Sequence, residues 1–250
     1  MVARGVVLSR GGRTLVAGLS FECSPSTVTA VIGPNGSGKT TLLDAIVGLV
    51  GIDGGELYVL GRAPGSCPRS VAYVLQDADI AHGSHLTVAE VVRMGCWAGR
   101  PFGFRPRENS SGRVRDVLER LDLDHLRLRR IGELSGGERQ RVMIAQGLVQ
   151  DAEVLLLDEP HTALDPPSRD LVDDVIAHER DRGRCILMAT HDLGEARRAG
   201  QVVLLGVAGV SPVVGSPERV MEVGHLKAAY GHNVVHLDEG GTAAIDDPHH

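Results

Sequence analysis

The fold of this chain is decided by the stretch Gly33-Pro34-Asn35-Gly36-Ser37-Gly38-Lys39-Thr40, which matches the phosphate-binding pattern of a glycine, four residues and then Gly-Lys-Ser/Thr. In such a loop, successive backbone N–H groups surround phosphate oxygens, and the following helix adds its positive N-terminal end. Lys39 is expected to reach the β- and γ-phosphates, and the Thr40 hydroxyl to bind Mg²⁺. We therefore predict a nucleotide-phosphate site that comprises this loop and Thr41.

Short apolar runs alternate with helix-like stretches on either side of this loop. Several of the runs are uninterrupted, which is typical of strands that are buried on both faces of a sheet. The alternation predicts an α/β fold with a mostly parallel sheet and helices on both sides. The predicted strands are Thr27–Ile32, Val71–Leu75, Val154–Leu157, Cys185–Ala189 and Val202–Leu205. The predicted helices are Lys39–Val47, Arg139–Val149, Ser168–Arg180 and Leu193–Arg198.

One segment, over residues 77–130, departs from this alternation. Its pattern predicts helices at Val88–Met94 and Arg113–Leu121 and no strand. Thr87 and Glu90 have the spacing of a capping box, which indicates a helix start. We therefore expect a helical insertion here.

The composition disfavours several classes of protein. Of 250 residues, 42% are apolar and 23% are charged, which fits one large or two small globular domains. The longest apolar run, Val202–Val210, is too short to cross a bilayer, and no N-terminal signal segment is visible, so we expect a cytoplasmic protein. The net charge of −6, without a long basic run, disfavours nucleic acid as a partner. The four cysteines are far apart and are expected to be reduced thiols.

A second signal is the apolar run Val154–Leu157 followed by Asp158 and Glu159. Taken alone, such a run is more often a buried strand and its exit turn. Beside a phosphate-binding loop, an acid at the end of a neighbouring strand can hold Mg²⁺, and we assign that role to Asp158. Glu159, one residue further, is placed to polarise the water that attacks the γ-phosphate, so we predict that it is the catalytic base of a hydrolase.

A third signal is Leu134-Ser135-Gly136-Gly137-Glu138. Ser135 and Glu138 have the spacing of a capping box before the Arg139–Val149 helix. Two glycines in a first helical turn are nonetheless unfavourable, by about 1 kcal/mol each relative to alanine. They are explained if a phosphate must approach the backbone closely at this helix N-terminus. Both interpretations stay open at this point.

In their order and spacing, these three motifs resemble those of the ATP-binding subunits of ABC transporters, over about residues 1–236. The resemblance implies further site residues. Gln76 resembles the glutamine that binds Mg²⁺ and senses the membrane partner. Asp165, in Ala163-Leu164-Asp165, resembles the D-loop aspartate, and His191 resembles the switch histidine that contacts the γ-phosphate.

The resemblance also implies a mechanism in which ATP binds between two copies of the chain. Two copies pair head to tail, and each ATP lies between the phosphate-binding loop of one copy and the Ser135–Glu138 signature of the other. The expected cofactors are therefore ATP and Mg²⁺. The other expected partner is a polytopic permease, which holds the subunit at the cytoplasmic face of the cell membrane, with an extracytoplasmic solute-binding protein at one remove.

The same resemblance sets the expected domain organisation. A single ABC ATPase domain spans residues 1–236, with a RecA-like core over 1–76 and 151–236 and an antiparallel β part near the N-terminus. An α-helical subdomain over 77–150 would dock on the permease. Residues 237–250 have no periodicity and are expected to form a disordered tail.

Three residues depart from the family pattern. Glu138 stands where glutamine is commonest in the signature, and His161 stands where threonine, serine or phenylalanine is more frequent. Arg10 falls where the family has an adenine-stacking aromatic residue. Because a guanidinium can also stack on a base, Arg10 is kept among the predicted nucleotide-binding residues.

The transported solute is predicted from resemblance alone. The segments Leu86–Gly95, Ile131–Glu133 and His232–His236 resemble those of subunits for zinc or manganese uptake. An iron–siderophore importer shares much of this pattern and stays an alternative, as does a soluble ABC-type ATPase of DNA repair or iron–sulfur assembly. A small-molecule kinase with the same loop would not explain the signature or the presence of both Glu159 and His191.

Overall fold

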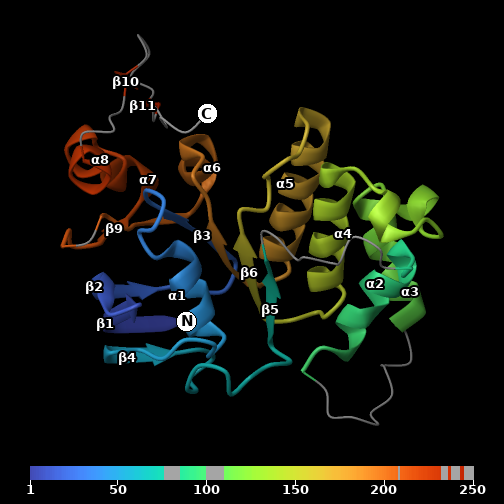
Figure 1. Ribbon diagram of the computed structural model, residues 1–250, viewed down its shortest axis with the longest axis horizontal. Helices are drawn as coiled ribbons and strands as arrows, with labels where there is room; N and C mark the ends of the chain where they lie inside the picture. Colours follow the sequence, from blue (N-terminus) through green and yellow to red (C-terminus); the bar gives the residue numbers. More distant parts are fainter. Residues whose placement is uncertain (76–84, 100–109, 208, 232–235, 238–242, 245–250) are drawn as a thin grey trace. The chain divides into compact units, whose positions relative to one another are not determined.

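The computed structural model describes residues 1–75, 85–99, 110–207, 209–231, 236–237 and 243–244. They belong to two compact units, one made of Met1–Ser66 and Leu187–His250 and the other of Cys67–Ile186 (Figure 1). Each unit contains a pair of parallel strands with helices packed on it, and the predicted α/β fold with a mostly parallel sheet is confirmed. Within the described ranges, no helix has both the length and the apolar character that a membrane crossing needs.

An antiparallel sheet begins the first unit. Strands β1 (Val2–Arg10), β2 (Arg13–Glu22) and β4 (Gly54–Tyr58) lie in the order β2-β1-β4. Gly11 and Gly12 connect β1 to β2 with φ angles of +58° and +77°, as a two-residue hairpin turn requires. The antiparallel part expected near the N-terminus is therefore present.

The rest of the first unit combines a parallel strand pair with a short antiparallel strand and several helices. The strands are β3 (Thr27–Ile32), β8 (Gln201–Leu204) and β9 (Val213–Gly215), and the helices are α1 (Lys39–Ile46), α6 (Leu193–Arg198), α7 (Pro217–Val220) and α8 (Val223–Tyr230). Strand β3 pairs in parallel with β8, and β8 pairs antiparallel with β9. Buried side chains of β3, β8, α6 and α8 form one apolar core. In the predicted tail, β10 (His236–Leu237) pairs with β11 (Ala243–Ala244), and the other tail residues lie outside the described ones.

The second unit combines two parallel strands with most of the longer helices. The strands are β5 (Val71–Val74) and β6 (Val154–Asp158), the helices are α2 (Val88–Met94), α3 (Ser110–Arg120), α4 (Gly136–Leu148) and α5 (Pro166–Asp181), and the short 3₁₀ turns are η1 (Gly95–Trp97), η2 (Asp124–Leu126) and η3 (Ile131–Glu133). Helix α4 packs closely on β5, because a Cβ on Gly147 would lie 2.5 Å from Cγ2 of Val74. The chain passes back to the first unit within strand β7 (Cys185–Ala189).

The described parts of the predicted insertion, residues 85–99 and 110–130, contain helices and no strand. Helix α2 begins at the predicted capping box, in which Thr87 Oγ1 accepts from the Glu90 N–H at 3.3 Å and the Glu90 carboxylate accepts from the Thr87 N–H at 2.7 Å. The compact unit also includes β5, β6 and α5, so it extends beyond the expected subdomain 77–150 on both sides.

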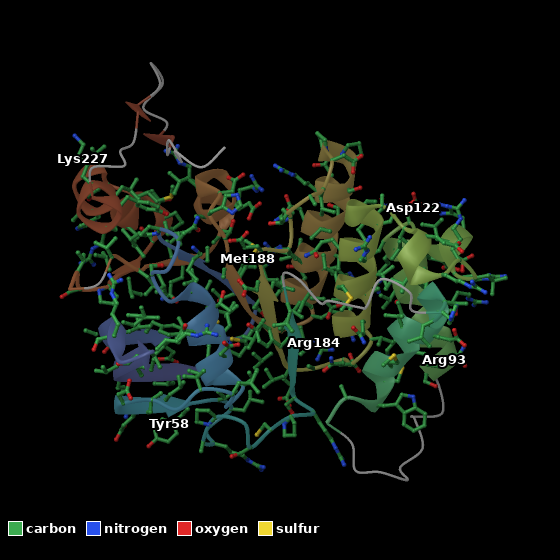
Figure 2. The ribbon with its side chains drawn as sticks, in the orientation of Figure 1. Tyr58, Arg93, Asp122, Arg184, Met188 and Lys227 are labelled. Carbon is green, nitrogen blue, oxygen red and sulfur yellow. The ribbon has the colours of Figure 1, made fainter. Side chains whose placement is uncertain are left out.

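An ion network centred on Asp151 connects the helical insertion to the rest of the second unit. Asp151, in the turn between α4 and β6, lies 3.0 Å from Nη2 of Arg113, on α3, and 3.0 Å from Nη2 of Arg182, after α5. It also pairs with Arg184, which Figure 2 labels. Burial raises the pKa of the Asp151 carboxyl, but the three arginines outweigh that effect, and the net pKa lies below its ordinary value. The network therefore joins α3 to the strand-bearing part of the same unit.

Replacing Asp151 by Asn should lower the free energy of unfolding by about 1.5–3 kcal/mol at neutral pH, the usual range for hydrogen bonds to charged groups. Asn tolerates the left-handed backbone of this residue, whose φ is +58°, so the change removes mainly the charge. Because the pKa of Asp151 is lowered by folding, the stabilisation is present above the unfolded-state pKa and is lost as the pH falls through the native pKa. Urea unfolding should therefore show that the free energies of unfolding of the parent and Asp151→Asn become equal as the pH is lowered.

The matched control is Asp122→Asn, at an exposed residue with a similar φ of +51° (Figure 2). This change should alter the free energy of unfolding by less than about 0.5 kcal/mol. Equal losses in the two variants, or a difference that persisted in acid, would contradict the role given to the network.

Candidate functional site

The predicted phosphate-binding loop connects β3 to α1 within the first unit. Gly33 has no room for a side chain, because a Cβ there would lie 2.3 Å from the carbonyl oxygen of Leu205. Gly36 and Gly38 have φ angles of +76° and +101°, a region that favours glycine. Gly38 precedes α1, whose N-terminus has no side-chain cap. The positive N-terminal end of this helix favours an anion.

Two side chains of the loop also fit an anion. Lys39 is buried, and its Nζ donates to the carbonyl oxygens of Gly33 at 2.8 Å and Pro34 at 3.4 Å, which holds the ammonium inside the loop. Ser37 is buried too, and its hydroxyl has no hydrogen-bond partner among the residues that the structure describes. A buried hydroxyl without a partner is unfavourable, and a phosphate oxygen would satisfy it. Of the other predicted contacts, Asn35 and Thr40 are exposed and Thr41 is buried.

The hairpin between β1 and β2 lies close to this loop in the same unit. A Cβ on Gly38 would lie 3.0 Å from Cγ2 of Val16 and 3.2 Å from Cβ of Leu15, both on β2. Arg10, the predicted base contact, is exposed at the hairpin turn and pairs in register with Arg13. Arg13 was not predicted from the sequence, where its only signal is the Gly-Gly turn that places it opposite Arg10. The hairpin therefore contacts the loop through Leu15 and Val16 and carries two arginines at its turn.

His191 lies at the same end of β3 as the loop. The Thr190 N–H donates to the carbonyl oxygen of Val31 at 3.0 Å, which places the residues after β7 beside the end of β3. Thr190 Oγ1 donates to the Glu195 carboxylate at 2.6 Å, and the Asp192 side chain caps α6. Between these anchored residues, His191 is exposed. The first unit thus brings together the phosphate-binding loop and the predicted switch histidine.

The two predicted acids lie in the second unit, where β6 ends. Every residue of β6 is buried, and Asp158 at its end is only 3% exposed. Glu159 is half-buried and has a φ of +49°, so the backbone turns sharply here. Its Oε2 accepts a hydrogen bond from Thr162 Oγ1 at 3.1 Å. Thr162 was not predicted, although its spacing of three residues from Glu159 is a weak signal for such a contact.

Asp165 is exposed at the N-terminus of α5. The helix begins at Pro166, two residues before the predicted start at Ser168. The Ser168 side chain lowers the pKa of the Asp165 carboxyl, which favours its ionised form. The predicted D-loop residue therefore presents a negative charge on the surface of the second unit.

The signature begins helix α4 in the same unit. The predicted capping box is present: Ser135 Oγ accepts from the Glu138 N–H at 3.2 Å, and the Glu138 carboxylate accepts from the Ser135 N–H at 2.8 Å. That backbone N–H lowers the pKa of the Glu138 carboxyl. The predicted helix start at Arg139 was wrong by three residues, because the box starts the helix at Gly136.

Packing explains why one of the signature residues, Gly137, is a glycine, without any role for a phosphate. A Cβ on Gly137 would lie 3.1 Å from the carbonyl oxygen of Ala163, close to Asp165 in sequence. A Cβ on Gly136 would lie 3.8 Å from the Ala163 side chain, which is ordinary contact. Close approach to the backbone of Ala163 and Leu164 thus accounts for Gly137, whereas Gly136 has space for a ligand.

The predicted residues fall into two groups. The first unit holds Arg10, His191 and the whole phosphate-binding loop, and the second holds the acids after β6, Asp165 and the signature. Gln76 lies outside the described residues.

The chain matches the family model for ABC transporters over residues 16–162, more than half of its length. It is 33% identical to the chelated iron transport system membrane protein YfeB of Yersinia pestis, over 96% of this chain and 82% of that protein. It is 35% identical to the manganese transport system ATP-binding protein MntB of Halalkalibacterium halodurans, over 76% of each. It is also 35% identical to the zinc transport system ATP-binding protein TroB of Treponema pallidum, over 82% of this chain and 76% of that protein.

Solved structures share the fold. The structure of an ATP-binding subunit of an ABC transporter superposes with a TM-score of 0.76 at 22% identity, over 91% of this chain and 95% of that chain. Together with the extent of the family match, these similarities show that the chain belongs to the ABC transporter family, as an ATP-binding subunit that hydrolyses ATP.

Proposed function

We propose that this subunit powers the uptake of zinc or manganese through a membrane permease. The observation that carries the proposal is the similarity to MntB and TroB, which are named for manganese and zinc transport, over three quarters or more of this chain. The similarity to YfeB, named for chelated iron, makes iron the second candidate. A soluble ATPase of DNA repair or iron–sulfur assembly has no support among these relatives.

The ATP phosphates would be held by the loop of the first unit. Its uncapped helix N-terminus, the Lys39 ammonium and the buried Ser37 hydroxyl all offer donors to phosphate oxygens. Arg10 would contact the base, in place of the aromatic residue usual in the family. The complete set of proposed nucleotide contacts is Gly33, Pro34, Asn35, Gly36, Ser37, Gly38, Lys39, Thr40, Thr41 and Arg10.

Thr40, Asp158 and Gln76 are the proposed Mg²⁺ ligands. Their hydroxyl, carboxylate and amide groups carry the kind of oxygen atoms that Mg²⁺ prefers, with Thr40 exposed at the start of α1 and Asp158 at the end of β6. When bound, the ion would neutralise charge on the phosphate oxygens.

Glu159 and His191 would carry the hydrolysis. The Glu159 carboxylate would accept a proton from the attacking water, and its hydrogen bond from Thr162 holds it in one orientation for that task. His191 would contact the γ-phosphate. It is suited to this because it is exposed at the strand end that leads into the phosphate-binding loop.

A complete site would need two copies of the chain paired head to tail. The first turn of α4 has an exposed Ser135 and a Gly136 with space above it, so this helix N-terminus can receive the ATP held by the loop of the other copy. Glu138 holds this turn in place through the capping box. Asp165 is exposed and close in sequence to the backbone that packs on the signature, which suits a contact across the dimer interface.

The transporter proposal also sets the location of the protein. The pair of subunits would lie at the cytoplasmic face of the cell membrane and bind a polytopic permease. An extracytoplasmic solute-binding protein would deliver the metal to that permease. Nucleic acid is not proposed as a partner, because the net charge is −6 and no long basic run occurs in the sequence.

Glu159→Gln should bind ATP like the parent but hydrolyse it more slowly by roughly 10²–10⁴-fold, the usual contribution of a general base. The amide keeps the size of the side chain and can still accept from the Thr162 hydroxyl, so the loss should come from the base alone. Phosphate release measures the rate, and light scattering with ATP should show a stable dimer. Glu119→Gln, at an exposed residue of α3, is the matched control. Hydrolysis by Glu159→Gln at the parent rate would mean that another group is the base.

Cells that normally make this chain should lose zinc or manganese accumulation when it is deleted. Radioactive zinc, manganese and iron measure the uptake, which the parent chain should restore and Glu159→Gln should not. Loss of iron uptake alone would favour the second candidate. Unchanged uptake of all three metals would contradict the proposed function.

A further inference from the structure

His161 lies in the β6–α5 connection, and it is buried. It lies two residues after Glu159 and is 4% exposed. Its Nε2 lies 2.9 Å from Oδ1 of Asp173, which is two turns into α5 and half-buried. The imidazole and the carboxylate are thus in direct contact. The pair therefore fixes the middle of the connection to a regular helix.

The connection that His161 anchors has an unusual backbone. Glu159 and Ala163 have φ angles of +49° and +62°, a region that side-chain-bearing residues seldom adopt. Two short turns close it: the Thr162 N–H donates to the Glu159 carbonyl oxygen, and the Leu164 N–H donates to that of His161, both at 3.2 Å. Left-handed residues of this kind persist only where the surrounding contacts hold them.

Contacts on the other side of the connection come from α4. Gln140 Nε2 donates to the carbonyl oxygen of Pro160 at 3.4 Å, and Gly137 allows the Ala163 backbone to lie close. Helix α4 thus contacts the backbone of the connection, and α5 contacts its His161 side chain. Threonine or serine at position 161 would be too short to reach Asp173 in the same way.

We infer that His161, through its contact with Asp173, is a positioning residue for Glu159. The Glu159 carboxylate is oriented by Thr162, the next residue after His161, so a shift of the connection would move the carboxylate. The inference rests on the proposed role of Glu159 as the base.

The test compares His161→Ala, Asp173→Ala and the double variant in steady-state ATP hydrolysis. Each single change should lower kcat by roughly tenfold to a hundredfold, the cost of a small misplacement of a reacting group. The KM for ATP should change less than about twofold, because the connection does not bind the nucleotide. The double variant should be no slower than the slower single variant, since both changes remove one contact.

Two further sets of variants separate positioning from general damage. Asp174→Ala and His178→Ala alter exposed residues of the same helix and should keep the parent kcat. His161→Gln keeps an N–H donor near the same place and should retain more activity than His161→Ala. If His161→Ala does not fold, Asp173→Ala is sufficient for the test. The Asp173 side chain is only half-buried, so its removal should leave the fold intact.

Parent-like kcat in Asp173→Ala, losses that multiply in the double variant, or an increase in KM with unchanged kcat would each overturn the inference. Failure of the proposed base is a separate result, since Glu159→Gln would then hydrolyse ATP at the parent rate whatever the His161 variants do.

Discussion

The site depends first on a tight fold of the phosphate-binding loop around the Lys39 ammonium. Nζ donates to the Gly33 carbonyl, and the same glycine lies so close to Leu205 that no Cβ could be placed there. The Leu205 N–H donates to Ile32 at 2.8 Å, which ties the loop to the β3–β8 pair. Helix α8 supports that pair from the C-terminal side: the Val207 N–H donates to the carbonyl oxygen of Ala229 at 3.1 Å. These hydrogen bonds and the close approach of Gly33 to Leu205 thus hold the donor-rich loop in place.

The second unit also has a sharp backbone turn at the end of a strand, but it is formed by different residues. The connection after β6 follows a fully buried strand, and, like the loop, it turns at once through a residue with positive φ, here Glu159 rather than a glycine. A glutamate in that conformation is strained, and strain of this kind is common where a side chain must be held in one functional orientation. The contacts from α4 and the His161–Asp173 pair hold the backbone of this connection in its left-handed turn. The phosphate-binding loop needs no such contacts, because glycine adopts these backbone angles without strain.

Local signals predicted most of the fold and of the candidate site. The strands Thr27–Ile32 and Cys185–Ala189 were predicted to the residue, because buried parallel strands are continuous apolar runs with clear ends. Strands β1 and β2 were missed, since their glycines and register shifts interrupt the alternation that a half-exposed strand should show. The His161–Asp173 contact joins residues twelve positions apart across a turn, and no periodicity could reveal it.

Each proposed ATP site combines the phosphate-binding loop of one copy with the signature of the other. Mixing two inactive variants, Lys39→Ala and Ser135→Arg, tests this arrangement, with hydrolysis measured as phosphate release. In a head-to-tail dimer one mixed pair has a single intact site, so the mixture should recover roughly a quarter of the parent rate if pairing is random. A mixture that stayed as inactive as its two components would contradict this arrangement, because a site within one chain cannot be restored by a partner.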